Sequence, residues 1–274
     1  MNKFSLILFN LLLALLFFTG SLYAGIVMEQ MRYELNTPDK KDSGVLLIQD
    51  NKMLFKDTTN NVSTLFDFDR DQMIVLDHNN KTFTVIDPEA FVKAVEDYTK
   101  KAEEMRQKHL ESLPPDQREM VEKMIKEREL ASGKDPSGKI VISIKNSEET
   151  ENISGYKANK YEVFHNNKLN EELWLTNDLE IQNELDLKKM SNLMTEFKKV
   201  NKRLGDDTVV NEDAFINLFA NGGFPLKTVD RSFGETVFIE EVVDIKKQDI
   251  PKDKFKLPSG YKERSVNELL KGAF

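Results

Sequence analysis

The sequence predicts an α+β protein whose main element is a large antiparallel sheet. Short segments with alternating apolar and polar residues recur along the chain, and Asn- and Asp-rich links of hairpin length join many of them. Segments with helical periodicity interrupt these strands in blocks, which is typical of an α+β layout. A sheet of about eleven strands must curl or close, because otherwise it leaves long exposed edges.

Six short strands are expected between residues 25 and 87. In the first, Val27, Met31 and Tyr33 share one face of a strand with period two. Asn60 and Asn61 occupy one of the links, where short polar side chains tolerate left-handed backbone angles. The expected strands are Ile26–Leu35, Gly44–Gln49, Lys52–Asp57, Val62–Phe68, Gln72–Asp77 and Thr82–Ile86. Their close spacing predicts an antiparallel meander.

A helical hairpin is predicted from about residue 88 to residue 132. Asp87 is suited to cap its first helix and Pro88 to the first helical position, and the proline pair at 114–115 separates the two helices. The apolar stripe of the first helix contains Phe91, Val95, Tyr98, Ala102, Met105 and His109. The stripe of the second helix is narrow, so a solvated, charge-rich excursion remains the alternative interpretation.

The remainder of the chain repeats these two patterns. Further strands are expected at Lys139–Lys145, Ala158–His165, Lys168–Thr176, Phe224–Asp230 and Thr236–Lys246. A helix is expected over about 185–203, where Leu187, Met190, Met194 and Phe197 recur at spacings of three and four, and a shorter helix over 214–220.

The N-terminus has the charge and hydropathy order of a cleavable signal peptide. Lys3 precedes an apolar run from Phe4 to Phe18, and small and turn-forming residues lead to Ala24. An uncleaved membrane anchor is the alternative, but crossing the hydrocarbon takes about 20 apolar residues. We therefore expect residues 1–24 to be removed and the mature protein to be exported to the periplasm or secreted. No cysteine follows the expected cut, so we expect it to be soluble, without lipidation or a stable membrane span.

Composition narrows the classes of function. Removing 24 of the 274 residues leaves 250, a length that suits a single domain over 25–274. The net charge of −8 without a basic cluster makes nucleic acid an unsuitable partner, because an acidic surface repels phosphate. The chain has no cysteine, which excludes thiol catalysis and cysteine metal sites.

Specific residues resemble a known family. The segment Ile153–Val163 (Ile-Ser-Gly-Tyr-Lys-Ala-Asn-Lys-Tyr-Glu-Val), followed by Glu172–Thr176 (Glu-Leu-Trp-Leu-Thr), resembles the central hairpin of exported bacterial proteins similar to the lipoprotein-localisation factors LolA and LolB. The closing segment from Ile250 to Tyr261 is similar to the end of many uncharacterised periplasmic members of that superfamily. The resemblance covers about 25–87 and 139–263.

This resemblance implies a curved, half-open antiparallel β-barrel with the inserted helices packed on its concave face. In some relatives the apolar cavity between them accepts acyl chains. Two features depart from the pattern, namely Ala158, where similar proteins often carry a cysteine, and the long hairpin at 88–132. Both departures count against the specific carriage of lipoproteins.

The sequence offers little catalytic chemistry. Asp67 to Asp71 has alternating acidic residues, but a calcium loop needs glycine and glutamate where this chain has Gln72 and His78. The three histidines lie far apart, and serine-nucleophile and phosphate-loop motifs are missing. We therefore expect no metal, no cofactor and no enzymatic activity. A hydrolase whose catalytic residues are dispersed along the sequence is the alternative to this expectation.

The apolar stripes bear most directly on function. Methionine adapts to irregular partners, so methionine-rich helix faces are typical of sites for greasy ligands. The candidate cavity-lining residues are Phe91, Tyr98, Trp174, Met190, Met194 and Phe197. Ordinary packing of helices on the sheet is the alternative for each of them, and Trp174 suits either a cavity mouth or the core.

Two functions follow from these observations. The leading hypothesis is a non-enzymatic periplasmic binding or carrier protein for a lipid or acyl chain. The alternative is an envelope interaction module that docks a protein partner through its charged helical hairpin.

Overall fold

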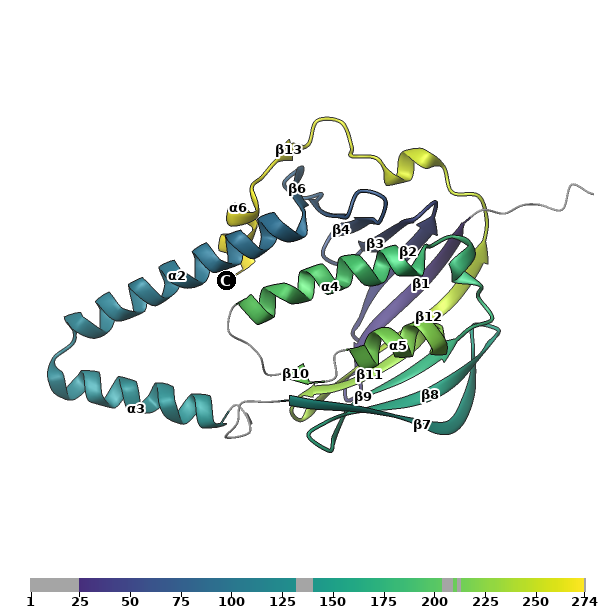
Figure 1. The fold of residues 1–274 in the computed structure, drawn as a ribbon. Coiled ribbons are helices and arrows are strands. Elements are labelled where there is room, and N and C mark those ends of the chain that lie inside the picture. The colour runs from purple at the N-terminus through teal and green to yellow at the C-terminus, as the bar shows by residue number, and fades with distance from the viewer. Residues whose placement is uncertain (1–24, 132–139, 204–208, 211–212, 274) are drawn as a thin grey trace, which may run out of the picture.

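The computed structural model describes residues 25–131, 140–203, 209–210 and 213–273 (Figure 1). Its strands form one sheet in the order β10-β7-β8-β9-β11-β12-β1-β2-β3-β4-β5-β6-β13. The strands are β1 Ile26–Glu34, β2 Lys41–Gln49, β3 Lys52–Asp57, β4 Val62–Asp67, β5 Gln72–Asp77, β6 Thr82–Ile86, β7 Ile140–Ile153, β8 Tyr156–His165, β9 Lys168–Thr176, β10 Val209–Val210, β11 Phe224–Phe233, β12 Thr236–Lys247 and β13 Lys262–Glu263. The predicted α+β class with a large, curved, unclosed antiparallel sheet is confirmed.

The sheet differs from the prediction in strand number. The described residues form thirteen strands, because β10 and β13 pair in parallel with the two ends of the antiparallel series. Each is two residues long, which is too short to show a period. Strand β7 also continues well past its expected end, because a bulge between Asn146 and Thr150 interrupts its alternation.

The longer helices follow the expected positions. They are α2 Pro88–Ser112, α3 Pro115–Ala131, α4 Leu187–Arg203 and α5 Asp213–Gly222, and a further helix, α6 Val266–Ala273, follows β13. The Asp87 side chain accepts a hydrogen bond from the Ala90 N–H at 2.8 Å and so caps α2. Arg118 of α3 donates to the Leu110 carbonyl at 2.9 Å, which closes the turn between α2 and α3. The signal-peptide prediction falls on residues 1–24, outside the described ranges.

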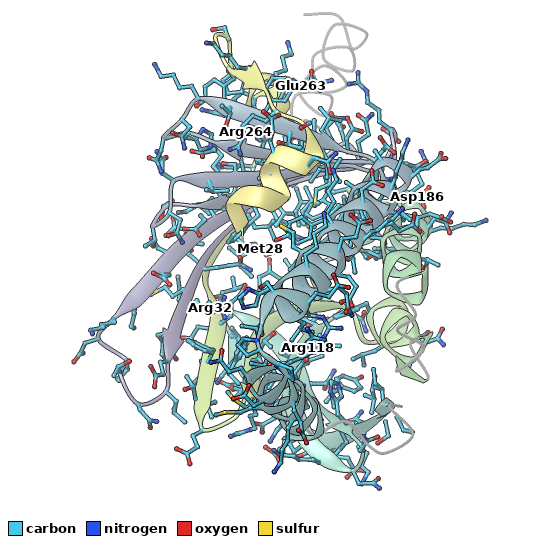
Figure 2. All side chains as sticks on the ribbon, turned by 90° about the vertical axis from the view of Figure 1, so that its left-hand side faces the viewer. Met28, Arg32, Arg118, Asp186, Glu263 and Arg264 are labelled. Carbon is cyan, nitrogen blue, oxygen red and sulfur yellow. The ribbon has the colours of Figure 1, made fainter. Side chains whose placement is uncertain are left out.

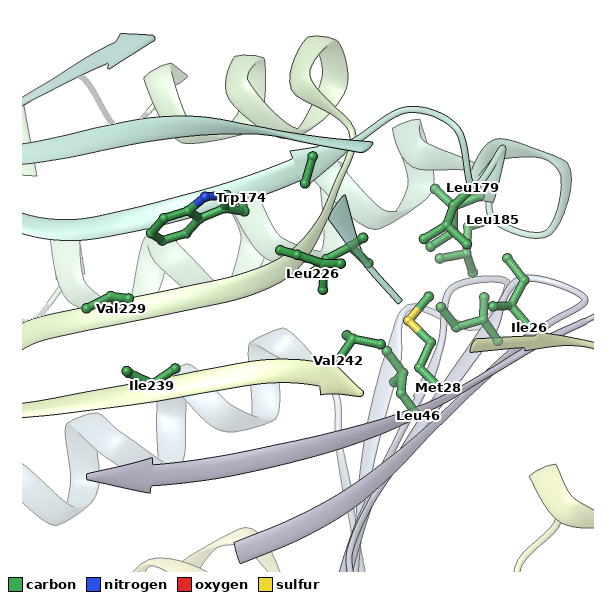
Figure 3. Close-up of a cluster of buried hydrophobic side chains, with 14 of the residues drawn as sticks. Ile26, Met28, Leu46, Trp174, Leu179, Leu185, Leu226, Val229, Ile239 and Val242 are labelled. Atoms are coloured by element: carbon green, nitrogen blue, oxygen red, sulfur yellow. The ribbon is translucent and has the colours of Figure 1, made fainter. Parts of the chain in front are cut away.

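Helices α2, α4, α5 and α6 cover one face of the sheet, which we call the inner face. Met28, Leu46 and Phe55 lie side by side in register on β1, β2 and β3. Their side chains belong to one hydrophobic cluster that also contains Leu193 of α4. Figure 2 places Met28 between the sheet and the helices, and Figure 3 shows the buried cluster around it. Helix α5 covers β7 to β9 through Leu218.

The outer face of β2 to β5 is closed by the segment that follows β12. Its core residues are Leu47, Leu54, Leu65, Ile74 and Leu76, packed with Ile250 and Phe255. The Ile250 N–H donates to Gln49 Oε1 at 2.8 Å, and Tyr261 contacts His78 Nδ1 through its hydroxyl at 2.8 Å. Residues 250–261, which we call the outer strap, therefore complete a second apolar core.

We expect Phe255→Ala to lower the free energy of unfolding by about 3–5 kcal/mol, because the ring is 9% exposed and its removal opens a cavity in the outer core. Urea unfolding measures the loss. Leu257→Ala is the matched control, since that side chain of the same strap is 41% exposed and its truncation changes stability by about 0.5 kcal/mol or less. Equal losses in the two variants would show that the strap does not close a core.

Candidate functional site

Beside leucines and isoleucines such as Leu46, Ile48 and Leu193, the cluster between the inner face and α4 contains a group of methionines and phenylalanines. We call this group the methionine layer, and its members are Met28, Met53, Phe55, Phe66, Phe68, Met190, Met194 and Phe197. Most of them are only partly buried, whereas Met28 and Phe68 are fully enclosed. Unbranched, polarizable methionines can repack around irregular partners more readily than the branched side chains beside them.

Strand register and helix period bring this layer together. Met53 of β3 pairs with Phe66 of β4, so the two side chains point to the same face. On α4, Met190, Met194 and Phe197 lie four and three residues apart and therefore on one stripe. Five of the eight residues come from the sheet and the turn after β4, and the alternation of β1, β3 and β4 is the sequence signal for the four that lie in strands.

The structure gathers four of the six sequence-predicted residues at one place. Met190, Met194 and Phe197 lie in the methionine layer, and Phe91 of α2 joins them through an edge-to-face contact with Phe197 at 5.8 Å between ring centroids. Tyr98 is half-buried further along α2.

Trp174 belongs to the same buried cluster but occupies the outer face of the sheet. Its neighbours Leu173 and Leu175 contact the α5 cluster, so alternation turns the indole the other way. Lys160 and Lys227, its register partners on β8 and β11, lie 5.4 and 4.8 Å from the ring. The indole therefore makes two cation–π contacts, which the sequence spacing does not predict.

Carboxylates form ion pairs with both lysines. Glu172 lies 2.9 Å from Lys160, and Glu151 lies 2.9 Å from Lys227. Glu172 also forms an ion pair with Arg231 of β11, at 2.6 Å. Burial alone raises the pKa of Glu172, but the hydrogen bonds from Arg231 and Lys160 lower it overall below the usual value. This network, which we call the tryptophan network, fastens β7 and β8 to β9 and β11.

A polar pocket of about 270 Å³ opens at the end of the methionine layer. It is lined by Gln30, Met31, Arg32, Asp42, Ser43, Gly44, Phe55, Asp57, Asn60 and Glu240. Phe55 belongs both to this pocket and to the methionine layer. A Cβ atom at position 44 would come within 2.6 Å of the Phe55 ring, so glycine is what allows the ring to lie across β2 and form the common wall.

The polar pocket carries one cation and three carboxylates. The Arg32 guanidinium lies 4.8 Å from the centre of the Phe238 ring. Glu240 pairs in register with Arg32 on the neighbouring strand, and its side chain is exposed. Burial acts to raise the pKa of Asp57, but hydrogen bonds from Asn60 and Thr59 lower it overall, so this carboxylate stays ionised. Asp42 completes the set.

A second pocket, of about 630 Å³, lies where α4 begins and is lined by Asp50, Asn51 and residues 182–187. The Asp186 N–H donates to Asn51 Oδ1 at 2.7 Å, and Asn51 Nδ2 donates to Asp69 at 3.1 Å. Lys189 forms an ion pair with Asp69 at 2.7 Å. These contacts join the start of α4 to two turns of the sheet, which gives this pocket a structural explanation.

The described ranges contain neither a cluster of metal ligands nor a helix that could span a membrane. No group of three histidine, aspartate or glutamate side chains in these ranges is placed to hold a metal ion. None of the helices there combines the length and the apolar character needed to cross a bilayer.

Residues 103–261 match the family model described as "Domain of unknown function (DUF4412)", which is more than half of the chain. The chain belongs to the DUF4412 family. The part matched by DUF4412 contains the tryptophan network, α4 and the outer strap, whereas β1 to β6 and most of the polar pocket precede it. No curated protein sequence matches the chain.

Solved structures show distant similarity. "Structure of PNGF-II in P21 space group" aligns with a TM-score of 0.43 and 12% identity over 90% of this chain and 32% of that chain. The crystal structure of an uncharacterized conserved protein from Thermus thermophilus aligns with a TM-score of 0.42 and 6% identity, over 89% of this chain and 91% of that chain. "Crystal structure of MucB" aligns with a TM-score of 0.33 and 9% identity, over 87% of this chain and 59% of that chain. The DUF4412 chain thus spans about a third of the PNGF-II chain, and similarity at this level identifies no function.

We expect Glu172→Gln to destabilise this DUF4412 protein by about 3 kcal/mol at neutral pH, because it leaves the partly buried Lys160 and Arg231 without their carboxylate. The lowered pKa of Glu172 contributes stability above the ordinary glutamate pKa, and that contribution is lost as pH falls through the folded-state value. The difference between wild type and variant should therefore shrink in acid, as urea unfolding at several pH values measures.

Glu149→Gln is the control for this substitution. Glu149 also pairs with Lys160, at 3.4 Å, but its side chain is 64% exposed, so its loss should change stability by about 1 kcal/mol or less. If Glu149→Gln proved as destabilising as Glu172→Gln, burial would not be what makes the tryptophan network important.

Proposed function

We propose that this protein is a non-enzymatic binding or carrier protein for a ligand with a long apolar chain, which enters the methionine layer between the sheet and α4. The observation that carries the proposal is the composition of that layer, in which flexible methionines from strands and helix meet phenylalanine rings. Several of these side chains are only partly buried, so a ligand reaches them without complete unfolding of the core.

The attachment of α4 supports this proposal. The start of the helix is tied to the sheet by the Asn51–Asp186 hydrogen bond and the Lys189–Asp69 ion pair. Along the helix the contacts of the methionine layer are apolar and therefore non-directional, so an acyl chain can replace side-chain contacts with equivalent ones. Such exchange costs little when the replaced side chains can repack.

The setting is proposed from the sequence. The leader predicted from the sequence supports export of the mature protein to the periplasm or out of the cell. A half-open barrel related to the lipoprotein-localisation factors accounts for the hairpin residues at 153–176 and for the curved, unclosed sheet.

We expect Met194→Glu to weaken the binding of a fluorescent long-chain fatty acid at least about tenfold, because a charge in the apolar layer must be desolvated when the ligand enters. Met124→Glu is the control, since the same change on α3 affects a side chain that is 58% exposed. Fluorescence titration measures both variants, and circular dichroism confirms that each is folded.

Met194→Leu provides a second variant that preserves apolar volume. It should retain binding but narrow the range of acyl-chain lengths that bind, since leucine repacks less freely than methionine. Failure of the wild-type protein to bind any long-chain amphiphile, or equal binding by Met194→Glu and Met124→Glu, would contradict the proposed function.

A second candidate function is docking of an envelope protein partner through the α2–α3 hairpin. The specific observation is that Met105, Met120 and Met124 of this hairpin are 64%, 65% and 58% exposed. Deleting residues 90–131 would also remove the buried Val92 and Ala94, so substitution of the three methionines by glutamine is the cleaner test. Loss of partner capture with unchanged fatty-acid binding would favour docking.

A further inference from the structure

We infer that the ligand is an amphiphile with a zwitterionic head group, whose ammonium and anionic parts bind in the polar pocket while its chain lies in the methionine layer. This inference rests on the proposed function and specifies the class of ligand. Phe55 of the polar pocket packs in the core, and Ser43 bonds to the turn after β3. Neither contact accounts for the charges of Arg32, Asp42 and Glu240 on one face.

The inner face changes from apolar to polar at the same level on adjacent strands. On β1, Met28 is followed on the same face by Gln30 and Arg32, and on β2 Leu46 is followed by Gly44 and Asp42. On β3 the same step leads from Phe55 to Asp57. A boundary shared by three strands matches a ligand that changes from chain to head group at one point.

The size of the polar pocket agrees with a head group. Pockets that enclose a whole drug-sized ligand are about 300–1,000 Å³, and this one is about 270 Å³. It is therefore too small for a complete lipid. Phe55 forms the wall shared with the methionine layer, so a chain leaving the pocket passes directly into apolar surroundings.

The charges of the pocket favour a zwitterion. Arg32 pairs in register with Asp42 on one side and Glu240 on the other, so the guanidinium lies between two carboxylate-bearing strands. Among the described residues Arg32 forms no salt bridge, and its guanidinium lies over the Phe238 ring. Its donors therefore suit a phosphate or carboxylate, while the flanking carboxylates suit an ammonium.

A purely anionic head group fits this pocket less well. It would find one guanidinium but three carboxylates, of which Asp57 is already held by Asn60 through hydrogen bonds of 2.7 and 2.8 Å. An unpaired anion beside Asp42 and Glu240 is repelled, whereas an adjacent ammonium offsets both. The excess of carboxylates thus selects for a positive group next to the negative one.

The test compares three probes with the same acyl chain, namely lysophosphatidylethanolamine, lysophosphatidylglycerol and the corresponding long-chain alcohol. Titration calorimetry on the purified protein should give at least about tenfold tighter binding for the zwitterionic lysolipid than for the anionic one. Arg32→Gln and Glu240→Gln should each weaken binding of lysophosphatidylethanolamine about tenfold and leave binding of the alcohol unchanged.

Glu235→Gln is the matched control, because Glu235 is exposed in the turn between β11 and β12 and the charge change is the same. Failure of all three probes to bind would overturn the proposed function itself. Equal binding of all three probes, or stronger binding of lysophosphatidylglycerol, would overturn only the head-group inference. Unchanged binding of the zwitterionic probe by Glu240→Gln would do the same.

Discussion

A broad sheet with apolar residues on both faces must be covered twice, and this requirement organises the rest of the protein. Met28, Leu46 and Ile48 face the helices, while Leu47, Leu54 and Leu65 alternate with such residues and face the other way. If either face were left open to water, a row of large apolar side chains would be exposed. The free-energy cost is roughly 25 cal/mol for each Å² of exposed apolar surface. Two different covers, from segments far apart in the chain, therefore close the two faces.

The two covers differ in how they are fastened. The outer strap is held by branched and aromatic residues and by polar contacts, including that of Ile250 with Gln49 and that of Tyr261 with His78. The inner cover, α4, has polar fastening at its start and methionine along its stripe. Hydrogen bonds fix geometry, whereas apolar contacts only require that space be filled. The inner face is accordingly the one suited to exchange its contacts.

Regular strands and helices can be predicted from sequence because their periods are local. The bounds of β3, β5, β6 and β9 agree with the expected ranges, and the three- and four-residue spacing on α4 identifies Met190, Met194 and Phe197. The prediction for β7 is too short, because its bulge replaces alternation by a polar run. The two-residue strands at the sheet ends depend on tertiary pairing and leave no local pattern.

The candidate site is less predictable, because its parts meet only across strands. Hydrophobicity groups Trp174 with the α4 methionines, but alternation turns it to the face where Lys160 and Lys227 lie. The sequence does not predict the polar pocket at all, since Arg32, Asp42 and Glu240 come from three strands and share no motif. Only the register of β12, β1 and β2 brings these charges together.

This register also separates the stiff part of the molecule from the adaptable part. The tryptophan network fixes β7, β8, β9 and β11 through partly buried ion pairs, whose geometry tolerates little displacement. The methionine layer lies on the other face of the sheet, mainly over β1 to β4, where apolar contacts dominate. Repacking of that layer would break none of these ion pairs, because their side chains lie on the opposite face of the sheet. The proposed uptake and release of an apolar chain depends on this combination, because the charges proposed to bind the head group stay together only while the register of β12, β1 and β2 is kept.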